Sequence, residues 1–256
     1  MNQSQSIRLN KFLAERLGLS RREADEAIAA GKVTIDGKVA TLGARVPTPD
    51  NVDNLPKVCY NRKIVPFRTD FLYLAFNKPV GYVCSRRAQG PAPTLYDLLP
   101  AEYRQLKTVG RLDKDSSGLI LLTNDGDFAY QMTHPKFHKE KVYEVELDRP
   151  LEPLHQQMIS DYGVMLDDGP SRFAVVRNAS PASLSKEGQK LATQGVVAET
   201  VDRTRFIVIL SEGRNRQIRR TFAALGYRVV ALHRTQFGPY QLSGLQPGEY
   251  SIIDKV

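Results

Sequence analysis

The chain has 256 residues, enough for one large domain or two unequal ones, each with its own hydrophobic core. Its 41% hydrophobic and 25% charged residues exclude wholesale disorder, a collagen-like chain and a disulfide-rich scaffold. A formal net charge of +8 indicates a polyanionic partner, and a nucleic acid is favoured over a membrane surface because the sequence has no run of about 18 apolar residues.

The positive charge is concentrated at the amino-terminal end. The first 68 residues hold 12 Lys and Arg against 7 Asp and Glu, whereas the rest of the chain holds 24 against 21. The first residues lack the apolar core of a secretory signal, so we expect a cytoplasmic protein. We predict a small basic binding module over residues 1–68, closed by a Pro-rich stretch and linker after Val46, and a larger module over residues 69–256.

Two helices and a strand hairpin are predicted in the small module. Residues 9–17 place apolar side chains at helical spacing, and Gly18 ends that stretch. Ser20 and Glu23 match a capping box at the start of a second helix. Residues 32–39 follow as strand, Asp-Gly turn and strand. The exposed side of this unit carries five candidate RNA-binding cations: Arg8, Lys11, Arg21, Arg22 and Lys32.

The order of these elements resembles the RNA-binding domain named after ribosomal small-subunit protein four. The matching stretches are residues 8–13, 20–24 and 31–37. A solvated helix face is the plainer interpretation of the cations. The resemblance instead implies a module that holds RNA backbone phosphates, with an affinity that falls steeply as salt rises.

The larger module is predicted to be α+β with a mostly antiparallel sheet. Its short β-rich runs, broken by turns, cover residues 72–76, 81–84, 119–123, 142–147, 174–176, 196–201 and 206–210. Helices are expected after Gly126 and over residues 215–225. Many strands with few helices between them favour antiparallel pairing. The polar stretch 178–195 is predicted to be a mobile surface insertion.

The segment 109–120 places charge beside a predicted buried strand. Arg111 and Asp113 lie in a Gly-bounded loop that leads directly into apolar residues, so we expect the carboxylate at the edge of the core. An Asp in such a loop often accepts hydrogen bonds from nearby amides, and a simple turn made by Asp113 or Asp115 is therefore the alternative to a functional role.

The segment 140–147 alternates and predicts a strand with Lys141, Tyr143 and Val145 on one face. Tyr143 can be a core aromatic with a solvated hydroxyl, or a surface on which a base stacks. The sequence pattern leaves both interpretations open.

The segment 211–226 begins a predicted helix with four arginines, Arg214, Arg216, Arg219 and Arg220. Positive charge at a helix N-terminus opposes the macrodipole. We therefore expect a carboxylate or phosphate partner at this end of the helix, whose buried stripe begins at Ile218.

Together with residues 76–81, 232–234 and 247–250, these segments resemble the bacterial rRNA pseudouridine synthases of the RsuA/RluB/RluF family. The resemblance runs from about residue 7 to the end and joins Gly110-Arg111-Leu112-Asp113 to the arginine-rich run behind the amino-terminal module. It implies that Asp113 is the catalytic nucleophile. The bond between ribose and N1 breaks, and the retained uracil rejoins through C5 with no external cofactor.

The resemblance also implies roles for the other candidate residues. Tyr143 would pack against the target base, and Arg219 would supply the cation that keeps Asp113 ionised. The implied substrate-binding residues are Arg111, which enters the RNA stack as the uridine leaves, Ile218, which lines the far side of the base, and the contact residues Lys141 and Arg216.

The implied partner is ribosomal RNA, with a slight preference for the large subunit and with a monomeric enzyme. No metal site is expected, because Cys59 and Cys84 stand alone and the four His share no ligand spacing. The alternatives are a noncatalytic rRNA-binding assembly factor, and an RNA methyltransferase, which would need a Gly-rich cofactor loop that the sequence lacks.

Overall fold

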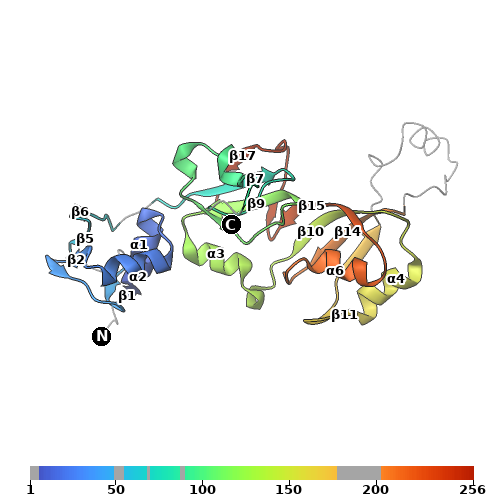
Figure 1. Cartoon of the computed structure of the whole chain (residues 1–256), viewed down its shortest axis with the longest axis horizontal. Coiled ribbons are helices and arrows are strands. Elements are labelled where there is room, and N and C mark those ends of the chain that lie inside the picture. Colours follow the sequence, from blue (N-terminus) through green and yellow to red (C-terminus); the bar gives the residue numbers. More distant parts are fainter. Residues whose placement is uncertain (1–5, 49–54, 68–69, 87–89, 178–202) are drawn as a thin grey trace.

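The computed structural model describes residues 6–48, 55–67, 70–86, 90–177 and 203–256. A small helix-and-strand module lies at one end, and a larger module is built on a long central sheet (Figure 1). The predicted strand 196–201 and the predicted insertion 178–195 lie outside the described residues.

The small module has the predicted order of helix, helix and hairpin. Its elements are β1 (Ser6–Arg8), α1 (Leu9–Leu17), α2 (Arg21–Ala29), β2 (Val33–Ile35), β3 (Lys38–Val39), β4 (Arg45–Pro47), β5 (Val58–Tyr60) and β6 (Lys63–Ile64). The capping box is present: the Glu23 amide donates to Ser20 Oγ at 3.1 Å, and the Ser20 amide donates to Glu23 Oε2 at 2.7 Å. Asp36 and Gly37 take φ of 50° and 81°, as a two-residue hairpin turn requires.

The stretch after Val46 is more than the predicted linker. β5 pairs with β2 and β6 pairs with β5, which completes a four-stranded sheet in the order β3-β2-β5-β6. Val58 and Val65 are buried in the same core as Leu9 and Phe12. Pro56 and Pro66, on which the predicted linker rested, flank these two short strands. Because proline is rare inside strands, the β-branched residues between them were not predicted as strands.

The larger module confirms the predicted α+β class. Its strands are β7 (Tyr73–Lys78), β8 (Lys107–Val109), β9 (Ser117–Thr123), β10 (Lys141–Leu147), β11 (Val164–Leu166), β12 (Gly169–Ser171), β13 (Ala174–Arg177), β14 (Arg205–Leu210), β15 (Val229–Phe237), β16 (Tyr240–Gln241) and β17 (Tyr250–Ile252). The main sheet runs in the order β13-β14-β10-β15-β9-β7-β17, with β16 beside β15 and β8 beside β9. Among the described residues, all strand pairs of this sheet are antiparallel except β15 with β9.

Two features of this sheet differ from the prediction. Residues 81–84 form no strand but a turn at Gly81, where φ is +94°, and one isolated bridge from Val83 to Thr94. The central strand β15 was unpredicted apart from the motif at residues 232–234. A β-bulge interrupts its register with β10 and hides the alternation that a sequence pattern detects.

Helices cover both faces of the sheet. They are α3 (Gly126–Thr133), α4 (Pro153–Gln157) and α6 (Gln217–Ala224), with short turns η2 (Leu95–Leu98), η3 (Ala101–Tyr103), η4 (Pro135–Phe137) and η5 (Met158–Tyr162). Along β7, Tyr73 and Ala75 enter one core cluster, whereas Leu74 and Phe76 enter the other. The strand is therefore buried on both faces. No helix among the described residues has the length and apolar character that a membrane crossing requires.

Cations on the larger module hold the end of α1. Lys107 Nζ donates to the carbonyl of Leu19 at 2.6 Å, and Arg86 Nη1 donates to that of Gly18 at 2.7 Å. On the other side, Lys11 Nζ of α1 lies 2.6 Å from Asp127 Oδ1 at the start of α3. The cations satisfy carbonyls that a helix C-terminus leaves open, so the small module contacts the larger one through defined polar groups.

Candidate active site

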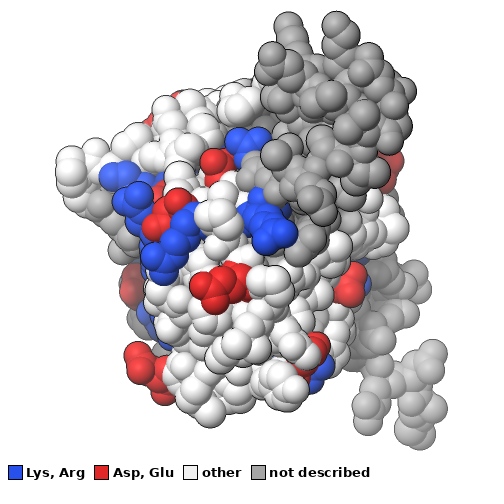
Figure 2. Space-filling model, turned by 90° about the vertical axis from the view of Figure 1, so that its right-hand side faces the viewer, with Lys and Arg blue, Asp and Glu red and all other residues white. Residues whose placement is uncertain are grey.

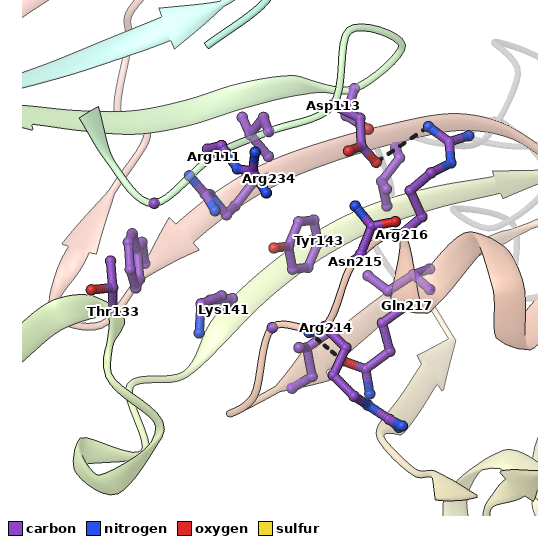
Figure 3. Close-up of a pocket in the computed structure, with 18 residues that line it drawn as sticks. Arg111, Asp113, Thr133, Lys141, Tyr143, Arg214, Asn215, Arg216, Gln217 and Arg234 are labelled. Atoms are coloured by element: carbon purple, nitrogen blue, oxygen red, sulfur yellow. Dashed lines mark hydrogen bonds and ion pairs between the residues drawn. The ribbon is translucent and has the colours of Figure 1, made fainter. Parts of the chain in front are cut away.

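A cavity of about 300 Å³ opens where the 110–116 loop, β10, β15 and the start of α6 meet. Six of the seven residues assigned to catalysis or substrate binding line it: Arg111, Asp113, Lys141, Tyr143, Arg216 and Ile218 (Figure 3). The seventh, Arg219, is not among the lining residues.

Backbone contacts fix the loop that carries Asp113. Lys78 is fully buried, and its Nζ donates to the carbonyls of Ser116 at 2.6 Å and of Pro79 at 3.0 Å. The Ser116 amide donates to the Asp113 carbonyl at 3.1 Å, and Leu112 is buried beneath the loop. The backbone is thus held from inside, while the Asp113 carboxylate faces the cavity with 32% of its side chain exposed.

The cation beside Asp113 is Arg216, whose guanidinium lies 3.4 Å from the carboxylate. Arg216 is also held by a bidentate contact to Asp115, with both N–O distances 3.0 Å. These bonds raise the pKa of Arg216 and lower that of Asp115. Arg216 takes a left-handed φ of 46° immediately before α6, which turns its side chain back over the loop.

Arg219 does not make the predicted contact with Asp113. Its Nε lies 3.3 Å from Asp115 Oδ2, while its other nitrogens donate to the carbonyls of Asp115 and Val229, each at 2.8 Å. One helical turn separates it from Arg216 and aims it at β15 and the loop backbone. From the sequence, Asp115 is considered only as a turn residue, although its place two residues after Asp113 was the available signal for a second carboxylate beside the arginines.

Tyr143 and Ile218 form apolar walls of the cavity, with 8% and 4% of their surfaces exposed. Tyr143 lies on β10 opposite Val208 of β14 and Arg234 of β15. A flat ring and an aliphatic side chain at one opening suit a planar ligand that stacks.

Lys141 and Arg234 lie on the other side of Tyr143 from Asp113 and Arg216 (Figure 3). Burial lowers the pKa of Lys141 to about 8, with the charge of Arg234 as a further cause. The two cations share the ring of Phe237: Lys141 Nζ lies 5.1 Å and Arg234 Cζ 4.9 Å from its centroid. The cavity therefore has one half with the ion pair of Asp113 and Arg216, and one half with the two cations Lys141 and Arg234.

Gly118 lies at the start of β9, in close contact with the backbone of Arg234 on β15. It takes a φ of +103°, and a Cβ built there would lie 2.3 Å from the carbonyl oxygen of Arg234. Only a residue without a side chain lets β9 begin this close to β15.

Two other arginines of the run bind a hairpin outside the cavity. Arg214 donates to Asp168 Oδ1 at 3.0 Å and to the Pro170 carbonyl at 2.7 Å, and Arg220 donates to Asp168 Oδ2 at 2.7 Å. The carboxylates that pair with the arginine-rich helix start are therefore Asp113, Asp115, Asp168 and Glu212.

The predicted RNA-binding cations of the small module are not equivalent. Arg8, Lys11 and Arg21 line a second hollow of about 480 Å³ together with Arg45. Arg22 and Lys32 are exposed and lie outside it. Lys11 forms an ion pair with Asp127, so its ammonium group is not free in the way that the expected phosphate contact requires.

Surface charge at the far end of the larger module is mixed. Figure 2 shows Lys and Arg interspersed with Asp and Glu there, so the described residues form no continuous basic patch on the part of that face which the view shows. Among the described residues, no group of three or more His, Cys, Asp and Glu side chains is arranged to hold a metal ion.

Two family descriptions match the chain. RNA pseudouridylate synthase matches residues 72–224, and the S4 domain matches residues 7–52. The ribosomal small subunit pseudouridine synthase A of Pasteurella multocida is 36% identical over 246 residues, covering 95% of this chain and 94% of that protein. The protein of the same name from Escherichia coli K12 is 34% identical, with 95% of each chain covered.

A solved structure is similar to nearly the whole chain. The crystal structure of a pseudouridylate synthase aligns with a TM-score of 0.62 at 30% identity, over 97% of this chain and 96% of that one. Both the arrangement of the modules along the chain and the sheet of the larger one are shared over nearly the whole length.

Proposed function

This chain belongs to the RNA pseudouridylate synthase family, and we propose that it converts a specific uridine of small-subunit ribosomal RNA to pseudouridine. The names of the relatives support the small subunit and not the slight large-subunit preference of the sequence analysis. Action on ribosomal RNA would require the enzyme where ribosomes assemble, in agreement with the expected cytoplasmic location.

One observation carries the proposal: a single carboxylate, Asp113, faces Tyr143 and Ile218 across a cavity of about 300 Å³. Asp113 is the one carboxylate among the described lining residues. A stacking wall with one anionic group suits a base that must be detached, turned and rejoined while it is retained.

In the proposed reaction Asp113 is the nucleophile: its carboxylate forms a transient bond to the nucleoside, at the sugar or at the base, and that bond breaks again before the product leaves. The N1–C1′ bond breaks, the uracil turns, and a C5–C1′ bond forms; the proton leaves C5, and N1 gains one, so the product is an isomer. Tyr143 and Ile218 hold the planar base during the turn. Arg111, exposed at the mouth of the cavity, takes the place that the uridine vacates in the RNA stack.

We assign the charge partner of Asp113 to Arg216, because its guanidinium is 3.4 Å away. Arg219 then acts through Asp115, which it contacts through side chain and backbone. This division revises the assignment expected from family resemblance, in which Arg219 was the direct partner.

We propose that residues 1–68 bind RNA and that residues 69–256 perform the chemistry. The exposed cations Arg8, Arg21, Arg22 and Lys32 suit phosphate contacts, which give affinity but no base specificity. Lys11 is instead assigned to the contact between the two modules because Asp127 neutralises it.

The experiment is to incubate the purified protein with transcripts of small-subunit and of large-subunit rRNA and to map pseudouridine in each. We expect one modified position in the small-subunit RNA and none in the other. Conversion of the large-subunit RNA alone would overturn the subunit assignment, whereas tight binding without conversion of either RNA would favour the assembly factor.

A further inference from the structure

Arg234 is a buried cation with unused hydrogen-bonding capacity. Only 2% of its surface is exposed, and its side chain lines the cavity. Its Nε donates to the carbonyl of Leu119 at 2.7 Å. Its Nη2 is buried and has no hydrogen-bond partner among the described residues. A guanidinium nitrogen left in this state costs free energy unless a ligand completes it.

A local irregularity in the backbone aims Arg234 at the cavity. Tyr143 pairs with Arg234, whereas Val142 pairs with Gln236, so Thr235 is the extra residue of a β-bulge. In a regular strand Arg234 and Phe237 would point to opposite faces, because they are three residues apart. The bulge places both beside the cavity, and bulges of this kind commonly re-aim a side chain next to a functional site.

Lys141 adds a second cation to the same place. It lies opposite Phe237 on the neighbouring strand, and both cations lie about 5 Å from the centroid of the Phe237 ring. Lys141 Nζ is held by neutral carbonyl groups, Lys139 at 3.1 Å and Glu212 at 3.5 Å. Repulsion from Arg234 contributes to the lowered pKa of Lys141, and a bound anion would relieve that repulsion.

Among the described residues that line the cavity, none brings a carboxylate to this half, and Glu212, which is not a lining residue, offsets only part of the shift in the pKa of Lys141. Asp113, the one carboxylate among the described lining residues, lies on the opposite side of Tyr143 and is paired with Arg216 (Figure 3). A group with two or more oxygen acceptors fits between a guanidinium and an ammonium, and phosphate is the anion that RNA carries on each side of every nucleoside.

We infer that Arg234 and Lys141 form a subsite that binds a backbone phosphate adjoining the target uridine. The inference rests on the proposed function, since that function places a uridine against Tyr143. The subsite anchors the sugar-phosphate side of the extruded nucleotide while Asp113 acts from the other side of the ring.

The test measures binding without turnover. The full-length protein is titrated with uridine 5′-monophosphate, uridine 3′-monophosphate and uridine, and the dissociation constants are compared by calorimetry or NMR. We expect at least one monophosphate to bind about 10-fold more tightly than uridine, as a charge-assisted contact to phosphate implies.

Two variants locate the preference. Arg234→Lys keeps the buried charge but removes the Nη2 donor, and Lys141→Met removes the second cation from a less buried position. Each should reduce the preference for the monophosphate to about 3-fold or less. The matched control is Arg104→Lys: Arg104 also donates its Nε to a backbone carbonyl, that of Leu99 at 3.0 Å, but lies outside the cavity.

Equal affinities for uridine and both monophosphates, or a preference that survives in both variants, would overturn the subsite. If Arg234→Lys unfolds, Lys141→Met decides alone. A protein that shows the phosphate preference but converts no rRNA would contradict the proposed function instead, so the two failures are distinct.

Discussion

The two modules use positive charge in opposite ways. In the small module Arg8, Arg21, Arg22 and Lys32 are exposed, and none has a carboxylate partner within 4.0 Å among the described residues. In the larger module several cations, from the buried Lys78 to the exposed Arg216, hold specific acceptors of the protein itself. Lys78 binds loop carbonyls, Arg216 and Arg219 bind Asp115, and Arg214 and Arg220 bind Asp168.

This difference shows that an excess of Lys and Arg has two meanings. Exposed, unpaired cations attract a polyanionic partner and contact its phosphates, and salt screens this attraction. Cations that are paired within the protein bind its own backbone carbonyls and carboxylates, and they fix the residues that line the cavity. Four predictions test the contrast.

The largest effect is expected for Asp113→Asn. It removes the single carboxylate that lines the described cavity, so the rate of pseudouridine formation should fall by about 10⁴-fold or more. RNA binding, assigned to the exposed cations of the other module, should change less than about 3-fold. Single-turnover assays and filter binding measure the two quantities. Retained activity would remove Asp113 from the mechanism.

Neutralising the small module should act on binding instead. In the combined variant Arg8→Gln, Arg21→Gln, Arg22→Gln and Lys32→Gln, the slope of log affinity against log salt should become shallower by about 3. Over a roughly fourfold rise in salt, the native protein should therefore lose about 60-fold more affinity than the variant. The rate constant at saturating RNA should stay unchanged. A slope equal to that of the native protein would contradict the assignment.

Arg216→Gln and Arg219→Gln separate two neighbouring cations, whose side chains are 43% and 12% exposed. Arg216→Gln should lower the rate at saturating RNA by about 10-fold, because Asp113 loses its charge partner, with little change in melting temperature. Arg219→Gln should lower the melting temperature more, since Arg219 is 12% exposed and bonds to two backbone carbonyls. The reverse pattern would return the role of direct partner to Arg219.

The smallest effect concerns pH and Lys141. Its pKa is about 8 in the folded protein, below the ordinary value of 10.5, because of burial, the facing charge of Arg234 and only partial compensation by Glu212. Folding therefore opposes protonation of Lys141. Its destabilising effect is present below about pH 8 and is relieved as pH rises toward 10.5.

Thermal melts of Lys141→Met and the native protein measure this effect. Relative to the native protein, the variant should be more stable near neutral pH than at about pH 10. Lys32→Met, at an exposed position, is the matched control and should show no such trend. A stability difference for Lys141→Met that is independent of pH would show that burial of Lys141 costs the fold nothing.

Local signals predicted local structure well. The capping box at Ser20, the Asp36-Gly37 turn and the alternation along β10 each depend on neighbouring residues, and the structure confirms all three. β15 was unpredicted because its bulge breaks the period of two, and β5 and β6 were unpredicted because pairing with β2 stabilises them more than their own composition does.

The candidate site shows the same limit. The sequence indicated Asp113 and the arginine-rich run, but which guanidinium faces which carboxylate depends on the left-handed backbone of Arg216. Arg234 lay in a noted motif without a role, since neither its burial nor its free Nη2 is visible before β9, β10 and β15 are assembled.

Gly118 makes the site intolerant of change at a position that carries no chemistry. Alanine there would be strained at a φ of +103° and would force the backbones of β9 and β15 apart, because its Cβ would lie 2.3 Å from the Arg234 carbonyl oxygen. The loop that carries Asp113 precedes Gly118, and Arg234 lies on the displaced strand. One added methyl group would therefore disturb both halves of the proposed nucleotide site at once. We expect a mutational scan to find substitution of this glycine as damaging as substitution of Asp113.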